Sequence, residues 1–128
     1  MPYQVSTESN GVGVVISFSG AVSGSEVIDL NGRLSAEELF SQCSYQIWDF
    51  SGATQLDITI DELRSLTLQD IAASATNPSL KTAIVGQQKL FAGKDRIFQI
   101  FEESWTTYRP EFFLDVKAAR EWATSNQI

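Results

Sequence analysis

Tyr45–Leu63 reads YQIWDFSGATQLDITIDEL, and this stretch decides how the chain folds. Its first six residues, Tyr45–Phe50, are mostly apolar, which is typical of a buried strand. The small residues Ser51–Thr54 predict a loop, and Thr59 with Glu62 forms a capping box that predicts the start of a helix. A strand, a loop and a helix in this order make half of an α/β crossover. Open α/β sheets usually place their functional sites at such a loop.

Strands and helices alternate along the rest of the chain. Asn10-Gly11 is a strong signal for the turn of an N-terminal β-hairpin, whose second strand we expect to end at Gly20. Later strands are expected at Thr82–Val85 and Phe112–Leu114. The order β-β-α-β-α-β-α-β-α predicts an α/β fold with a mostly parallel, five-stranded sheet, an N-terminal β-hairpin and helices packed against it.

The helices carry two predictions that depend on residue spacing. Ser23 with Glu26 forms a capping box and predicts the start of the first helix, which is either kinked at Asn31-Gly32 or divided into two short helices. The helix behind Thr59 has an apolar stripe at helical spacing, which we expect to be buried. The residues of this stripe are Ile60, Leu63, Thr67, Ile71 and Ala75.

Length and charge limit the class of protein. The 128 residues predict a single domain, residues 1–128. The net charge of −7 disfavours binding to nucleic acid, because an acidic surface cannot neutralise phosphates. No apolar run approaches the roughly 18 residues that a membrane span needs, and the N-terminus lacks the segments of a signal peptide. We therefore expect a cytoplasmic protein that is not transmembrane.

Residue counts also bear on catalysis. Histidine is absent, which excludes a Ser-His-Asp triad, a Cys-His pair and imidazole ligands for a metal. Cys43 is the only cysteine, so it cannot form a disulfide within the chain, and we expect a packed thiol. We expect no enzyme, no catalytic residues, no metal site and no cofactor. Chemistry based on lysine or carboxylate groups alone is left open.

Five stretches resemble the STAS superfamily, named for sulfate transporters and anti-sigma-factor antagonists, and in particular its stand-alone SpoIIAA-like branch. They are IWDFSGATQLDIT (Ile47–Thr59), DELRSL (Asp61–Leu66), TAIVG (Thr82–Gly86), FAGKDRIFQIF (Phe91–Phe101) and FFLDVKAAREWA (Phe112–Ala123). The resemblance covers nearly the whole chain. It implies a SpoIIAA-like fold and a regulatory interaction module of bacterial type.

The resemblance also implies site residues. In the anti-sigma antagonists, the second serine of a D-S-S-G run is phosphorylated by the partner kinase. Asp57-Ile58-Thr59-Ile60 matches this run, with Thr59 at the phosphorylated position and isoleucines in place of the first serine and the glycine. Whether Thr59 is phosphorylated or serves only as an N-cap stays open.

A protein partner is the implied binding partner, with a kinase or an anti-sigma-like regulator as the candidate class. We expect it to dock on the loop 51–59 and the following helix. The candidates for partner binding or phosphorylation are Ser51, Thr54, Asp57 and Thr59.

Two further groups of residues offer binding chemistry. Lys89, Lys94 and Arg96 concentrate positive charge near the start of a predicted helix, where they could hold a carboxylate or a phosphate, or form a solvated helix face. That helix, Leu90–Thr106, is apolar on more than one side. It is therefore packed in the core, or it lines an apolar pocket or a homodimer surface. A carrier or sensor of a lipid-like or other apolar small ligand is the alternative function.

Overall fold

A computed structural model describes residues 3–8, 12–91 and 111–125 of the chain. Its sheet has the strand order β1-β2-β3-β4-β5, with β1 antiparallel to β2 and every later pair parallel. This confirms the predicted α/β fold with an N-terminal hairpin and a mostly parallel sheet. The strands are β1 (Tyr3–Glu8), β2 (Gly13–Ser23), β3 (Tyr45–Asp57), β4 (Lys81–Val85) and β5 (Glu111–Phe113).

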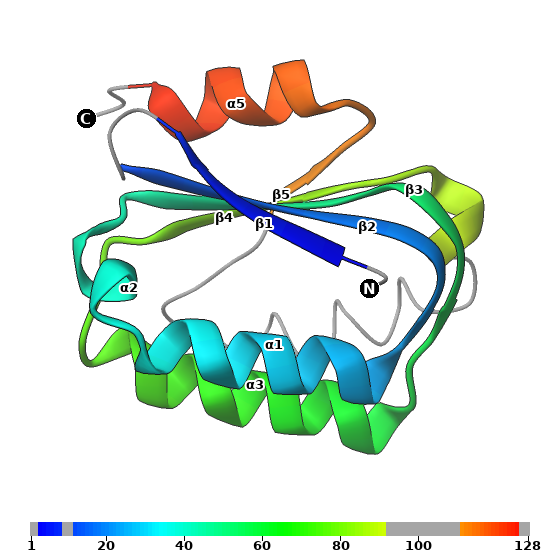
Figure 1. The fold of residues 1–128 in the computed structure, drawn as a ribbon, viewed down its shortest axis with the longest axis horizontal. Coiled ribbons are helices and arrows are strands. Elements are labelled where there is room, and N and C mark those ends of the chain that lie inside the picture. Colours follow the sequence, from blue (N-terminus) through cyan, green and yellow to red (C-terminus); the bar gives the residue numbers. More distant parts are fainter. Residues whose placement is uncertain (1–2, 9–11, 92–110, 126–128) are drawn as a thin grey trace.

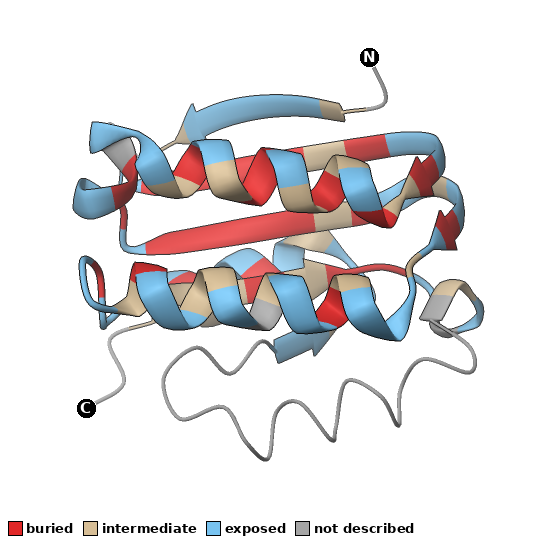
Figure 2. Ribbon diagram, turned by 90° about the horizontal axis from the view of Figure 1, so that it is seen from below, coloured by how far each residue is buried: buried red, intermediate tan, exposed pale blue. Residues whose placement is uncertain are grey.

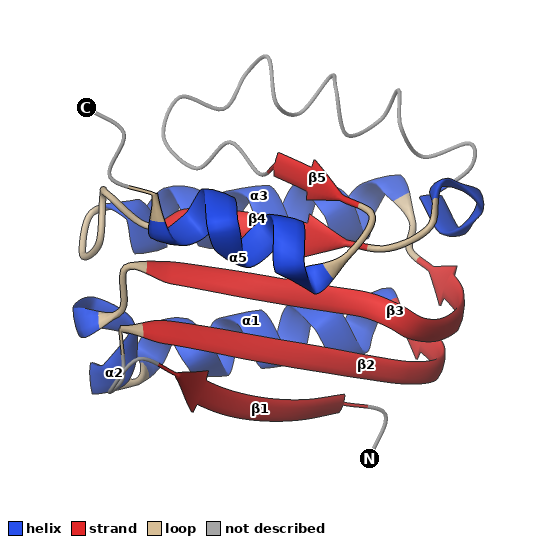
Figure 3. Ribbon diagram, turned by 90° about the horizontal axis from the view of Figure 1, so that it is seen from above, coloured by secondary structure: helices blue, strands red, loops and turns tan. Residues whose placement is uncertain are grey.

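Helices cover both faces of the sheet (Figure 1). The helices α1 and α3 lie side by side on one face, and α5 lies on the other face above β3 and β4 (Figures 1 and 3). The helices are α1 (Gly24–Ala36), α2 (Glu38–Gln42), α3 (Ile60–Ser74), the 3₁₀ helix η1 (Gln88–Phe91) and α5 (Val116–Thr124). None of the helices in the described part of the chain is long and apolar enough to span a membrane.

The inner part of β3 supplies side chains to the cores on both faces of the sheet. Trp48 and Phe50 point to the α1 side, where the Phe50 ring stacks on Phe18 with 4.5 Å between centroids. Tyr45 and Ile47 point to the α5 side and join a second core cluster. Alternate side chains of a strand point to opposite faces. A strand covered on both faces therefore reads as a continuous apolar run, which explains the signal at Tyr45–Phe50.

The strand β3 is longer than the sequence predicts. Tyr45–Asp49 lies between β2 and β4, which confirms an inner parallel strand. Ser51–Thr54, predicted as a loop, is instead part of the strand, because Gly52–Asp57 pairs with Ser19–Ser23 of β2. The two paired segments, here called the β2/β3 extension, leave the sheet and curve toward the starts of α1 and α3 (Figure 1).

The prediction that Gly20 ends the second strand is also wrong, because Ser19–Ser23 continues β2 by pairing with β3. The register shifts between Ser17 and Ser19 and again after Gly20, which has a positive φ of 71°. Such irregularities bend a strand and increase its twist without ending it. The strand therefore continues to Ser23, the N-cap residue of α1.

The first helical segment divides at Glu37 and not at Asn31-Gly32. Glu37 has extended backbone angles (φ −83°, ψ 147°) and ends α1, while Asn31 and Gly32 lie inside that helix. The Asn31 side chain is buried and donates to Gln69 Oε1 (3.0 Å) and Asp70 Oδ1 (3.1 Å) of α3. These bonds satisfy the buried Asn31 amide between the two helices, so the helix continues past it.

The predicted buried stripe of α3 is mostly wrong. Leu63 is buried, but Ile60 and Ile71 are about half exposed, at 51% and 50%. The side of α3 that faces α1 and the sheet carries Leu66 and Ala73 besides Leu63, and Asp70 lies between them. Buried, intermediate and exposed residues alternate along the helix (Figure 2). An apolar stripe is the usual sign of a buried helix face. Because polar side chains make part of the contact between α1 and α3, the apolar pattern of the sequence does not mark the buried face of α3. Ala75 is exposed, and the side chain of Thr67 lies outside the described residues.

The last elements are shifted or described in part. The strand predicted at Phe112–Leu114 is observed at Glu111–Phe113, and Leu114 is 73% exposed. Only η1 is described of the helix predicted at Leu90–Thr106. The rest of that helix, with the homodimer surface expected on it, lies outside the described residues.

Candidate functional site

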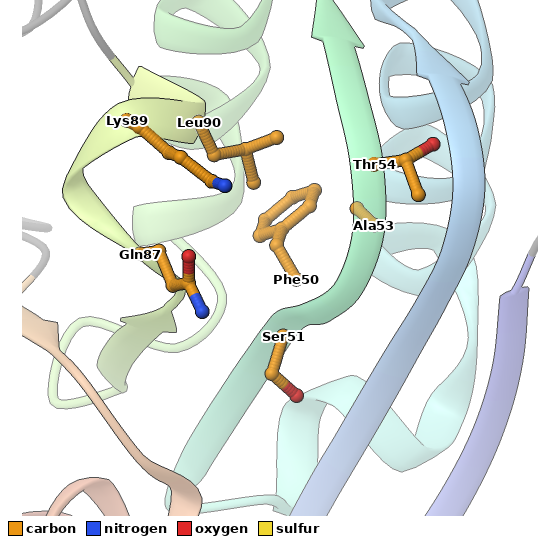
Figure 4. A pocket seen from close by; sticks show the side chains of 7 residues that line it. All are labelled: Phe50, Ser51, Ala53, Thr54, Gln87, Lys89 and Leu90. Carbon is orange, nitrogen blue, oxygen red and sulfur yellow. The ribbon is translucent and has the colours of Figure 1, made fainter.

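A pocket of about 420 Å³ opens at the C-terminal edge of the sheet, where β3 leaves β4 (Figure 4). One wall is β3 at the start of the β2/β3 extension, and the other is the segment that follows β4. Its lining residues are Phe50, Ser51, Ala53, Thr54, Gln87, Lys89 and Leu90. A volume of this size is at the lower end of the range for small-molecule sites.

Backbone hydrogen bonds place the second wall. The Gly86 N–H donates to the Phe113 carbonyl (3.1 Å), which keeps the chain beside β5 as it leaves β4. The Leu90 N–H then donates to the Gln87 carbonyl (3.0 Å) and closes the 3₁₀ turn. This turn directs Lys89 toward β3, where its side chain reaches toward the Phe50 ring (Figure 4).

The pocket combines an apolar floor with a polar rim. Phe50 is buried in the core cluster between α1 and the sheet, and Leu90 packs against that same cluster. Of the described residues that line the pocket, only Lys89 carries a charge, and it is exposed. The Thr54 side chain lies on the far side of the strand from Lys89 (Figure 4). The predicted anion-binding group is therefore represented here by Lys89, while Lys94 and Arg96 lie outside the described residues.

The second cluster of candidates lies at the other end of the β2/β3 extension, where α3 begins. Thr59 is exposed and is the N-cap of α3: its Oγ1 accepts from the Glu62 N–H (3.1 Å), and Glu62 Oε1 accepts from the Thr59 N–H (2.9 Å). This confirms the predicted capping box. Asp57 is exposed two residues earlier and accepts a hydrogen bond from Gln55 Nε2 (2.8 Å).

The four partner-site candidates therefore divide into two places. Ser51 and Thr54 line the pocket, whereas Asp57 and Thr59 do not and instead precede α3. A phosphoryl group on Thr59 would meet the open N–H groups of a helix start, which stabilise an anion. It would also meet the carboxylates of Asp61 and Glu62 in the first turn of α3. Phosphorylation of Thr59 stays a prediction.

Sequence reasoning missed two features that the structure brings out. One is the exposed apolar side of α3, with Ile60, Leu68 and Ile71 at 51%, 63% and 50% exposure. The other is Asp70, whose pKa is raised to about 6 by burial, against the opposing effect of its hydrogen bond from Asn31. Leucine and isoleucine at helical spacing predict a core face, and an aspartate predicts a solvated one. Neither feature therefore has a signal in the sequence.

No protein-family model and no curated protein matches the chain. In structure, the chain is similar to the crystal structure of an uncharacterised protein from the DUF3478 family with a SpoIIAA-like fold, from Shewanella loihica PV-4. The two share 14% sequence identity over 94% of this chain and 91% of that chain, with a TM-score of 0.51. The chain has a SpoIIAA-like fold, as its resemblance in sequence implied. A likeness at this identity extends to the fold and not to the function.

Proposed function

We propose that this protein is a non-enzymatic interaction module that docks a protein partner on α3 and on the strand end before it. One observation carries the proposal: Ile60, Leu68 and Ile71 are large, aliphatic and half or more exposed. At about 100° per residue, their spacing places them within a sector of roughly 80° on the helix surface. Exposed apolar groups gathered on one helix face are a usual feature of a docking site.

The polar groups around this face add directionality. Asp57 and Thr59 are exposed at the start of α3, and Asp61 follows in its first turn, where it pairs weakly with Arg64 at 3.5 Å. An apolar centre with a polar rim is the common anatomy of a protein interface. Carboxylates on one side of the rim favour a partner with basic residues beside an apolar groove. These are the same candidates, Asp57 and Thr59, that the sequence places in the partner site.

Affinity capture with matched variants tests this proposal. Leu68→Asp places a charge in the centre of the exposed face, and Leu114→Asp places the same charge at an exposed leucine outside α3. Burying a leucine side chain contributes about 1.5–3 kcal/mol, so we expect Leu68→Asp to weaken binding roughly 10- to 100-fold. Leu114→Asp is expected to bind as the wild type does. Equal capture of every bound protein by all three forms would contradict docking through α3.

A second candidate function is a carrier or sensor of an apolar small ligand. The observation that favours it is the pocket, whose floor is formed by Phe50, Ala53 and Leu90. Native mass spectrometry of gently purified protein, together with thermal shifts across fatty acids, tests this function. A bare protein mass with no thermal shift would contradict it.

A further inference from the structure

We infer that the pocket beside β3 binds a small organic acid, with its carboxylate at Lys89 and its short apolar chain on the floor of the pocket. The inference rests on the second candidate function, because it names the class of ligand for that pocket. It depends on the size of the pocket, on how its apolar and polar groups are arranged, and on its charge.

Size and floor limit the apolar part of the ligand. The volume of about 420 Å³ suits a small molecule. The described apolar lining consists of Phe50, Ala53 and Leu90, and all three belong to or pack against the core between α1 and the sheet. Stacking on Phe18 fixes the orientation of Phe50. The described floor of three apolar residues matches the length of a short chain.

Charge limits the polar part of the ligand. Lys89 supplies one ammonium group, and no other described residue that lines the pocket is charged. One cation matches the single charge of a carboxylate, whereas a phosphate monoester carries nearly two charges and usually needs several donors. Gln87 lines the same wall, and its amide can donate to a second carboxylate oxygen.

The charge of the whole chain makes Lys89 the decisive group. With a net charge of −7, the surface repels anions. An organic acid therefore needs a local cation, and on the described lining Lys89 provides it. A neutral molecule of the same length gains no charge pairing with Lys89. Binding of an acid, but not of the matching alcohol, should therefore depend on this side chain.

An NMR titration of the ¹⁵N-labelled full chain tests the inference with three probes: sodium octanoate, 1-octanol and sodium acetate. We expect octanoate to shift the backbone amides of Ala53, Thr54 and Leu90 in a saturable way. Acetate at the same concentration should not do so, and octanol should bind at least fivefold more weakly. Lys89→Gln should weaken octanoate binding by roughly tenfold and leave octanol binding unchanged.

Two further variants control the result. Lys117→Gln removes an exposed lysine of α5 that does not line the pocket, so octanoate should bind as to the wild type. Ala53→Leu fills the floor, so both octanoate and octanol should bind more weakly. Folding of each variant is checked by its amide spectrum without ligand.

Three outcomes would overturn the inference, and they differ in what else they remove. If octanol and octanoate bind equally, and Lys89→Gln changes neither affinity, the pocket is an apolar-ligand site without preference for an acid. Acetate binding as strongly as octanoate would remove the apolar chain from the ligand class. No saturable shift with any probe would remove both the inference and the second candidate function.

Discussion

The two halves of β3 belong to one strand and have opposite environments. The side chains of Tyr45–Trp48, in the inner half, are at most 6% exposed, since β2 and β4 flank them and helices cover both faces. Among the described strands, Gly52–Asp57, the outer half, pairs with β2 alone, and only Leu56 is buried in it. The comparison teaches that one strand can be part of the core at one end and expose polar side chains at the other.

The largest expected effect comes from truncating the inner half. Ile47 is 0% exposed, so Ile47→Ala removes buried methyl groups and leaves a cavity. We expect the free energy of unfolding to fall by about 3–4 kcal/mol. The matched change in the outer half, Gln55→Ala at an exposed position, should cost less than about 0.5 kcal/mol. Urea unfolding of both variants measures the difference, and similar losses would erase the contrast between the halves.

Asp70 sharpens the comparison, because burial beside α1 makes its ionised carboxylate unfavourable in the folded state. Burial raises its pKa from 3.8 to about 6. The folded state therefore holds this proton more tightly than the unfolded state does. The contribution of Asp70 is most favourable below pH 4 and is lost as the pH rises through 6.

Asp70→Asn should remove this loss, since an amide does not titrate. A rise of the pKa from 3.8 to about 6 corresponds to roughly 2–3 kcal/mol. We therefore expect the variant to exceed the wild type in unfolding free energy by about 2 kcal/mol more at pH 8 than at pH 4. Urea unfolding at both pH values measures this difference between the two proteins. A difference that does not change with pH would show that the Asp70 carboxyl is not held in a desolvated site.

The junction between the halves gives the next effect. A Cβ at Gly52 would lie 2.8 Å from the Phe18 carbonyl oxygen, so Gly52→Ala forces the paired backbones apart. We expect a loss of about 1–3 kcal/mol, by analogy with overpacking. Gly20→Ala meets no atom within 4 Å but has a φ of 71°, and it should cost about 1 kcal/mol. Thermal unfolding compares the two variants. An unchanged melting temperature for Gly52→Ala would mean that the paired backbones of the extension move apart at little cost.

The smallest effect is expected at the end of the outer half. Thr59→Ala removes the N-cap oxygen that accepts from the Glu62 N–H, and we expect it to cost about 1 kcal/mol. Thr59→Ser keeps that oxygen and should cost little. The free energy of unfolding in urea distinguishes them. Equal losses in both variants would assign the role of Thr59 to its methyl group and not to the cap.

The same contrast explains what the sequence could predict. Capping by Ser23 and Thr59 was predicted because its partners lie three residues away along the chain. Pairing of Gly52–Asp57 with Ser19–Ser23 joins distant segments, and small residues such as Ser51–Thr54 have the composition of a turn. The contact of Asn31 with α3 also joins distant segments, so residue spacing alone does not show which face of α3 is buried.

The candidate site was predictable in its location and not in its parts. Ser51, Thr54 and Lys89 come after the apolar runs of two predicted parallel strands, whose carboxyl ends meet at one edge of the sheet. The structure brings these three residues to one pocket. Gln87 and Leu90 reach that pocket through a 3₁₀ turn that has no clear signal in the sequence. The order of predicted strands therefore indicates the edge of the sheet, but it does not indicate the pocket.

Native-state hydrogen exchange tests the division of β3 most directly, because it reads the opening of each backbone amide along one strand. Amides of Tyr45–Asp49 that are hydrogen-bonded should exchange only through global unfolding. Those of Gly52–Asp57 should open at least about 2 kcal/mol more easily and exchange roughly 30-fold faster. Uniform protection from Tyr45 to Asp57 would contradict the account, since the outer half would then be as much a part of the folded core as the inner half.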